Sequence, residues 1–197
     1  MPTLMQVEKF RDLLLRFASS YVLMSMEDLA QAESFMAIRR FEKGEVLCRA
    51  GDAFTDLCFV AQGLFKAYFT ADDGTTWIRS FSSEGQHLGP YGSILLGRPS
   101  SVTVEALEDS VVVSLPFEKM LKLYDLGKKW ERFGRLVAED HYKWWEVREH
   151  QLMVLDAMGR YQAAIKMLDP ILHRLKQRDI AQFLGVTPEA LSRLRKK

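Results

Sequence analysis

The most concentrated chemistry in the sequence is a cluster of cationic side chains at its C-terminal end. Residues 174–197 contain seven lysines and arginines against two acidic residues, a net charge of +5. Because the whole chain of 197 residues carries a formal net charge of +1, residues 1–173 carry −4. A basic segment attached to a slightly acidic body favours a polyanionic partner for that segment alone.

The spacing of small and apolar residues in this segment is typical of two short helices joined by a tight turn. Ala181 is the small residue needed where two helices cross closely, and Gly185 permits the positive φ of the turn. Leu191 follows Gly185 by six residues and is expected to pack against the first helix. The remaining core positions are assigned to Ile180, Leu184, Val186 and Leu194.

The second of these helices carries the side chains that could contact DNA. Thr187 caps its N-terminus, Pro188 lies in its first turn, and Glu189 complements its dipole. Phosphate neutralisation by the basic face beyond them would supply most of the affinity. The predicted DNA-binding residues are Thr187, Pro188, Glu189, Ser192, Arg193, Lys196 and Lys197. The alternative is a helical hairpin whose charges are simply solvated.

The other residues offer little for catalysis or metal binding. Of the four histidines only His87 lies in the strand-rich part of the chain, so no metal site can be assembled. The sequence also contains no Gly-x-Ser-x-Gly motif, no P-loop and no Cys–His pair in a suitable context for catalysis. Cys48 and Cys58 are expected to be reduced core thiols, too few for an iron–sulfur cluster in one chain. We therefore predict that the protein has no cofactor and is not an enzyme.

The hydropathy pattern gives no membrane-directed segment. There is no run of about 18 apolar residues, and residues 1–10 lack the apolar core of a signal peptide. These features predict a cytoplasmic protein with no membrane partner.

The distribution of glycine separates a strand-rich region from helical ones. Eight of the twelve glycines fall between Gly44 and Gly97, and such frequent turns indicate short strands. About eight strands are expected between Ile38 and Leu115, forming an antiparallel β-roll, that is, a double-sheet jelly roll.

Two strand pairs are predicted within this region. Asp73-Gly74 is a hairpin turn between Leu64–Thr70 and Thr75–Phe81. Val102–Leu107 and Val111–Leu115 are expected to form the last pair of neighbouring strands.

Helices are predicted on both sides of the strands. Two precede them, over Leu4–Phe17 and from Met26 to about Phe35. One covers about Phe117–Leu126, and a longer one follows to about Glu149. The fold class is therefore α+β, and the expected domains are 1–116 (β-roll with N-terminal helices), 117–150 (linker and long helix) and 151–197 (helix-turn-helix).

The long helix has an aromatic-rich apolar stripe with spacings of three and four residues. Its predicted dimer-helix residues, here called the dimer stripe, are Leu126, Trp130, Phe133, Val137 and Trp144. Such a stripe needs another surface to cover it. The covering surface is either the same helix of a second copy or the chain's own β-roll.

A β-roll, a long helix and a C-terminal helix-turn-helix together resemble the Crp/Fnr family of bacterial transcription regulators. The resemblance covers nearly the whole chain and is carried by Phe41–Leu47, Gly51-Asp52, Phe59–Gly63, Gly85–Gly89, Ala106–Ser110 and Ile180–Arg195. It implies a homodimeric regulator of transcription that binds double-stranded DNA. It also implies a cyclic-nucleotide-binding-like sensor domain, with a small-molecule effector and RNA polymerase as candidate partners.

The resemblance also assigns base readout to Pro188, Glu189 and Arg193. Arginine suits guanine and glutamate suits cytosine in the major groove, whereas Pro188 stands where some members have arginine. Many members continue into a β-wing after the recognition helix. Since the sequence ends at Lys197, we expect the wing to be reduced or missing, which weakens or abolishes DNA binding.

The expected phosphate-binding turn departs from the family pattern. Members that bind cyclic nucleotides carry Gly-Glu-Leu and, further on, an arginine; the glutamate holds the ribose and the arginine pairs with the phosphate. Here Pro90 replaces the glutamate and Ser100 replaces the arginine, so high-affinity cAMP binding is not expected. Candidate effector-pocket residues are Gly89, Tyr91, Arg98, Ser100 and Ser101.

Overall fold

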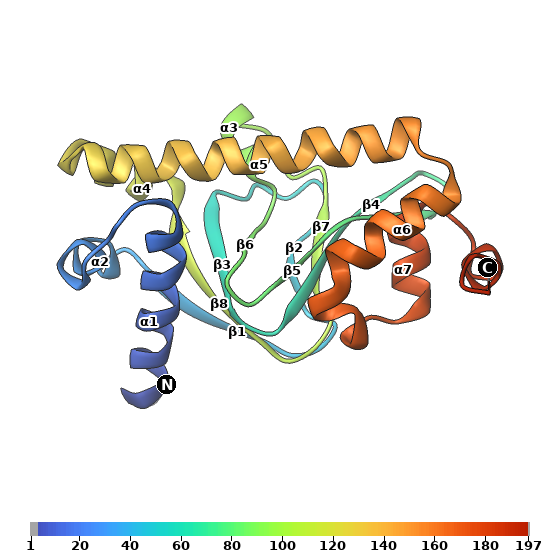
Figure 1. Ribbon diagram of the computed structural model, residues 1–197. Coiled ribbons are helices and arrows are strands. Elements are labelled where there is room, and N and C mark those ends of the chain that lie inside the picture. Colours follow the sequence, from blue (N-terminus) through green and yellow to red (C-terminus); the bar gives the residue numbers. More distant parts are fainter. Residues whose placement is uncertain (1–3, 197) are drawn as a thin grey trace. The chain divides into compact units, whose positions relative to one another are not determined.

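The computed structural model describes residues 4–196, and its fold is of the α+β class expected from the sequence (Figure 1). The chain divides into two compact units. Unit 1 comprises the chain up to Ala67 together with residues 81–138, and unit 2 comprises residues 68–80 and 139–197. Each unit is described by itself.

Two helices open unit 1. Helix α1 covers Leu4–Tyr21 and helix α2 covers Met26–Glu33. Ser25 caps α2 in a capping box: its hydroxyl accepts from the Asp28 N–H at 3.1 Å, and the Asp28 carboxylate accepts from the Ser25 N–H at 2.7 Å. Helix α2 therefore begins at Met26, as predicted, and ends two residues before the predicted end near Phe35.

Within residues 4–196, eight strands form two four-stranded sheets with the orders β1-β8-β3-β6 and β2-β7-β4-β5. The strands are β1 (Ala37–Phe41), β2 (Val46–Cys48), β3 (Asp56–Gln62), β4 (Leu64–Thr70), β5 (Thr76–Ser83), β6 (His87–Leu88), β7 (Thr103–Ala106) and β8 (Ser110–Pro116). The predicted hairpin of β4 and β5 is confirmed. The two-residue strand β6 was not predicted, because so short a segment has no periodicity.

The predicted pairing of Val102–Leu107 with Val111–Leu115 is wrong. Strand β7 pairs with β2 in one sheet, whereas β8 lies between β1 and β3 in the other. The connection between them crosses from sheet to sheet. Six consecutive residues of β8 are buried, so both of its faces are covered. A three-residue connection between two apolar segments fits a hairpin and a crossover equally well. The sequence alone therefore does not show which strand pairs with β7 or with β8.

The interior of the roll is filled by side chains from both sheets. Its core includes Phe41, Phe65 and Val112, and the rings of Phe41 and Phe65 meet edge to face at 5.6 Å. The opposite face of the β1-β8-β3-β6 sheet is covered by helices, which pack on Val113 and Leu115. That outer face is therefore a second core.

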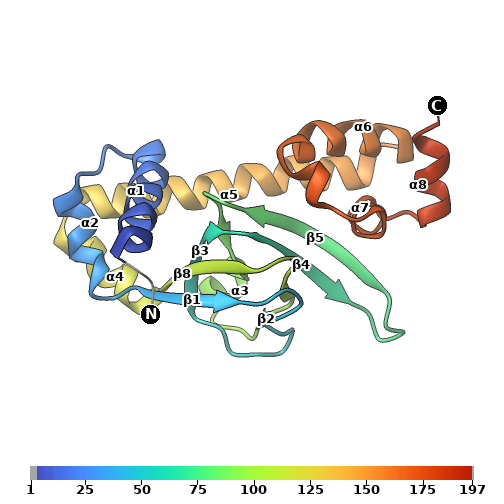
Figure 2. The same ribbon diagram turned by 90° about the horizontal axis from the view of Figure 1, so that it is seen from below.

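Helices α3 (Tyr91–Leu96), α4 (Phe117–Leu126) and α5 (Lys128–Val154) follow the roll. Figures 1 and 2 both show α1, α2 and α4 gathered at one end of the strands beside the first turns of α5. Helix α4 has the predicted bounds, and α5 extends beyond the predicted end near Glu149. Helix α3 was not predicted.

The structure corrects the role of Trp130 in the dimer stripe. Trp130 is only 5% exposed and packs against Ala18, Met120 and Leu123 within its own unit. Its indole N–H donates to the Gln31 side-chain oxygen at 3.0 Å. Because so little of its surface remains free, Trp130 covers the chain's own core rather than a second copy.

Unit 2 contains the C-terminal helices, which Figure 2 shows grouped around the end of α5. They are α6 (Ala157–Leu168), the 3₁₀ helix η1 (Asp169–Arg174), α7 (Gln177–Leu184) and α8 (Pro188–Leu194). Helix α6 ends at Leu168, immediately before Asp169-Pro170, and α7 and α8 are the two predicted short helices.

Candidate functional site

The turn between α7 and α8 has the backbone that the sequence predicts. Gly185 ends α7 in the left-handed region at φ +68°, and its N–H bonds to the carbonyls of Ala181 and Gln182. A Cβ placed on Gly185 would meet no atom within 4 Å. The need for glycine there is therefore one of backbone conformation and not of space.

This geometry predicts a stability effect. Gly185→Ala should lower the free energy of unfolding by about 1–2 kcal/mol, because an L-residue is disfavoured at this positive φ. Gly92→Ala is the matched control: Gly92 lies in α3 without a positive φ and with open space around its Cα. The control should be neutral or slightly stabilising. Urea unfolding measures both, and equal values for the two variants would contradict the assignment of the turn.

The core that holds α7 against α8 is largely the predicted one. Ile180, Ala181, Leu184 and Leu191 are all buried. Val186 and Leu194 are only half-buried, so they cover the edge of the motif rather than fill its core. Phe183, which the sequence analysis missed, is fully buried.

Two arginines bind the C-terminal end of α7. The Arg148 guanidinium, on α5, donates to the Phe183 carbonyl and stacks 3.8 Å from the centre of the Phe183 ring. Arg160, on α6, donates to the Leu184 carbonyl at 3.1 Å and to the Leu155 carbonyl at 2.8 Å. These carbonyls are the acceptors that a helix end leaves open. Helix α7 is thereby fixed to α5 and α6.

Arg148 is held in an environment that disfavours its charge. Burial, with a smaller contribution from the neighbouring Arg160, lowers its pKa to about 10. It therefore remains cationic at neutral pH, where its interaction with the helix end is charge-assisted. This role could not be predicted from the amino-acid sequence, because Arg148 lies among charged residues that are exposed on α5.

The N-terminus of α8 is built as predicted. The Thr187 hydroxyl accepts from the Ala190 N–H at 3.2 Å, which caps the helix, and Pro188 occupies the first position. Hydrogen bonds from its own backbone N–H and from the Thr187 hydroxyl hold the pKa of Glu189 below its usual value. Glu189 is therefore an anionic acceptor at neutral pH.

One face of α8 presents polar and charged side chains to solvent. The exposed members of the predicted set are Thr187, Pro188, Glu189, Ser192, Arg193 and Lys196. Lys197 lies outside the described residues. A capped helix with one acceptor near its start, a cation in its last turn and a second cation just beyond its end has the chemistry to meet base edges and phosphates.

The predicted effector-pocket residues differ in their exposure and in their contacts. Ser100 is buried, and its hydroxyl donates to the Val102 carbonyl at 2.7 Å and accepts from the Val102 N–H at 3.2 Å. Arg98 and Ser101 are exposed. Gly89, at φ +121°, lies against Phe54. Only Tyr91 lines the large apolar cavity of unit 1, which lies elsewhere.

The other residues of the dimer stripe differ in how far their side chains are exposed. Leu126 is 61% exposed, whereas Phe133, Val137 and Trp144 are half-buried. Phe133 meets Trp130 edge to face at 5.9 Å, and Val137 lines the cavity of unit 1. Trp144 packs edge to face on Trp145 at 4.8 Å. The members other than Trp130 stay predictions as dimer contacts.

Among residues 4–196, no group of three or more His, Cys, Asp or Glu side chains is placed to hold a metal ion. Every helix in that range is too short or too polar to cross a bilayer.

Comparison with protein families and curated proteins relates the chain to bacterial regulators. The family model for the cyclic nucleotide-binding domain matches residues 38–126. The chain is 26% identical over 191 residues to an anaerobic regulatory protein of Aggregatibacter actinomycetemcomitans, covering 87% of this chain and 70% of that protein. It is 30% identical over 176 residues to the fumarate and nitrate reduction regulatory protein of Yersinia pestis, with coverages of 78% and 65%.

Solved structures share the fold. FixK2 from Bradyrhizobium japonicum matches with a TM-score of 0.71 and 21% identity, covering 82% of this chain and 83% of that one. The regulator CLP of Xanthomonas campestris, described as responsive to c-di-GMP, matches with a TM-score of 0.71 and 16% identity, with coverages of 87% and 90%.

Proposed function

Because the chain belongs to the Crp/Fnr family of transcription regulators, we propose that it acts as a homodimer that places α8 of each copy in the major groove of double-stranded DNA. The observation that carries this proposal is the exposed face of α8, a helix with a formed N-cap that presents Glu189 and Arg193 and is followed by the exposed Lys196. Catalysis has no part in the proposal, and the site of action is the cytoplasm, where bacterial DNA lies.

The side chains of α8 divide into two roles. Arg193 would pair with guanine and Glu189 would accept from cytosine, which gives sequence preference. Lys196, Ser192 and Thr187 would contact phosphates and so position the helix without reading sequence. Pro188 offers no hydrogen-bond donor, and one base contact is lost or moved at its position.

Dimerisation would double this surface. Two copies of α8 about 34 Å apart would meet successive turns of the major groove. For the contact between copies we retain Leu126, Phe133, Val137 and Trp144 of the dimer stripe, and we remove Trp130. The proposed division of labour keeps residues 1–116 as sensor, 117–150 as linker and dimer helix, and 151–197 as the DNA-binding part. A small-molecule effector and RNA polymerase are the further proposed partners.

Phosphate contacts make the DNA-binding proposal directly testable. Fluorescence anisotropy of a random-sequence duplex, titrated with the full chain at several salt concentrations, should show affinity falling steeply with salt. The slope of log K against log [salt] should be about −0.9 for each phosphate contact. A duplex that fails to bind even at low salt would contradict the proposal.

We also predict that cAMP and cGMP do not bind at micromolar concentrations. Pro90 is fully buried and cannot hold a ribose hydroxyl, while the Ser100 hydroxyl is already bonded to the backbone of Val102. A cyclic phosphate would lack its bidentate cation. Calorimetry with either nucleotide should give no binding heat, and a micromolar dissociation constant would contradict this prediction.

A further inference from the structure

An apolar cavity in unit 1 lies outside the β-roll. It has a volume of about 120 Å³ and lies between the outer face of the β1-β8-β3-β6 sheet and the helices that cover it. The sheet contributes Phe59, Val113 and Leu115, and α5 contributes Trp130 and Phe133. An engineered apolar cavity of about 150 Å³ is known to bind benzene. The cavity is therefore of a size to accept one aromatic ring.

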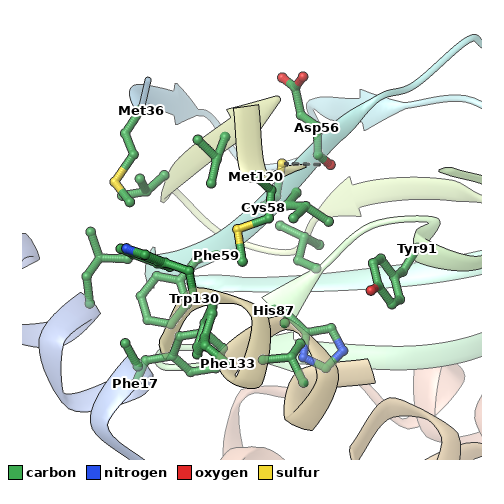
Figure 3. Close-up of a pocket in the computed structure, with 18 of the residues that line it drawn as sticks. Phe17, Met36, Asp56, Cys58, Phe59, His87, Tyr91, Met120, Trp130 and Phe133 are labelled. Atoms are coloured by element: carbon green, nitrogen blue, oxygen red, sulfur yellow. Dashed lines mark hydrogen bonds between the residues drawn. The ribbon is translucent and has the colours of Figure 1, made fainter. Parts of the chain in front are cut away.

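Aromatic side chains form one wall of the cavity, as Figure 3 shows. Phe17 lies 4.7 Å from Phe59 and 6.0 Å from Phe133, measured between ring centres, and the second pair meets edge to face. Trp130 continues the same wall. Edges and faces arranged in this way favour a planar aromatic ligand over a branched aliphatic one.

A small polar corner lies in this otherwise apolar lining, formed by His87, Tyr91 and Tyr124. Figure 3 shows Tyr91 and His87 on the side away from Phe17, while the Asp56 carboxylate points out of the cavity. The Cys58 thiol is already directed at the Asp56 carbonyl, 3.9 Å away. The hydroxyls of the two tyrosines are thus the groups suited to a neutral hydrogen bond with a ligand.

Gly134 fixes the position of the Tyr124 hydroxyl. A Cβ on Gly134 would lie 2.0 Å from that oxygen, so only glycine allows α5 and the phenol to approach so closely. Glycine inside a helix costs about 1 kcal/mol relative to alanine. Burial, with Tyr91 nearby, raises the pKa of Tyr124 to about 12, so the phenol stays protonated and can donate. Gly134 therefore makes α5 less stable than alanine would, but it leaves room for the Tyr124 hydroxyl beside the helix.

From these observations we infer that the cavity is a binding site for single-ring aromatic compounds carrying one hydroxyl group, with the ring against Phe17 and Phe133 and the hydroxyl bonded to Tyr124. Phenol is the simplest member of the class. Since Trp130, Phe133 and Val137 belong to α5, an occupant that binds better to one position of α5 would favour that position. Only this consequence for DNA binding rests on the proposed function.

The site is tested with the full chain by calorimetry, using phenol and toluene as probes and no DNA. Phenol is expected to bind with a dissociation constant of about 0.1–1 mM. Ala18→Leu, which fills the cavity from α1, should weaken both probes at least about tenfold. If neither phenol nor toluene binds to the unmodified chain, the cavity is only a packing gap. The same conclusion follows if a folded Ala18→Leu variant binds both probes with unchanged affinity.

Tyr124→Phe tests the hydroxyl without changing the volume of the cavity. It should weaken phenol by about 5–10-fold, the value of one hydrogen bond, and leave toluene unchanged. The matched control is Tyr142→Phe, because Tyr142 is 68% exposed on α5; it should alter neither probe. Equal affinities of the Tyr124→Phe and unmodified chains for phenol would overturn the assigned pose. This comparison decides the matter even if Ala18→Leu does not fold.

The link to α5 is measured separately, as the affinity for DNA with and without saturating phenol. A change of at least about threefold is expected, corresponding to a small differential affinity for two positions of α5. An unchanged DNA affinity would remove the link. A chain that binds phenol but no DNA would contradict the proposed function and leave the site standing.

Discussion

Replacing Trp130 with alanine is expected to lower the free energy of unfolding by about 3–5 kcal/mol, the usual cost of truncating a buried aromatic residue. The indole fills the core shared by α1, α2, α4 and the β-roll, and its N–H is bonded to Gln31. Its removal leaves a void in this core, whereas the Gln31 oxygen, which is exposed, can bond to water instead. Chemical denaturation of the full chain measures the effect.

A second tryptophan provides the matched control. Trp77 is 44% exposed on β5, and Trp77→Ala should cost less than about 1 kcal/mol. Sedimentation of the Trp130→Ala protein under native conditions separates the two roles assigned to this residue. A variant of normal stability that dissociates into monomers would return Trp130 to the dimer interface and contradict its place in the core.

The second large effect is expected at Arg193, on the exposed face of α8. Arg193→Ala should weaken binding to the preferred DNA sequence by about 1–3 kcal/mol, or roughly 10–100-fold, because a bidentate pair with a guanine is lost. Preference at that base position should also relax. Folding should be unaffected, since Arg193 is exposed. Anisotropy with matched and mismatched duplexes measures both changes.

Two controls distinguish base readout from charge. Lys196→Ala should reduce affinity for all duplexes alike and lower the salt slope by about one contact. Arg16→Ala removes the same charge from an exposed position of α1 and should leave affinity unchanged. If Arg193→Ala weakens matched and mismatched duplexes equally, Arg193 contacts phosphate and the assignment of a base contact to it is wrong.

The elements that sequence predicted well are those fixed by nearby residues. Ser25 and Asp28 start α2, Asp73-Gly74 turns β4 into β5, and Gly185 with Thr187 joins α7 to α8. In each case the signal is a backbone requirement or a cap satisfied within a few residues. Such signals do not depend on the rest of the fold.

The errors concern contacts between distant residues. The apolar run of β8 cannot show which strand lies beside it, since a strand covered on both faces has no alternation to read. Trp130 has the spacing of a dimer stripe, yet α1 and α2 cover it. Which surface covers an apolar stripe depends on the assembled fold. The sequence alone was compatible with both the same helix of a second copy and the chain's own β-roll.

The candidate site was predictable in part for the same reason. The exposed residues of α8 follow from its cap and helical period, whereas Arg148 and Phe183 meet through side chains from different helices. The cavity outside the roll depends on five elements or more. The family resemblance made Gly89 and Ser100 candidate effector-pocket residues, but the Ser100 hydroxyl is already hydrogen-bonded to the backbone of Val102.

Selection of bound duplexes from a random pool tests the central claim most directly. We predict enrichment of a two-fold symmetric site whose half-sites are about 10–10.5 base pairs apart, or a multiple of that spacing, with guanine or cytosine at the positions read by Arg193 and Glu189. Recovery of no common sequence after repeated rounds at low salt, from a chain shown to be folded, would contradict DNA recognition by α8.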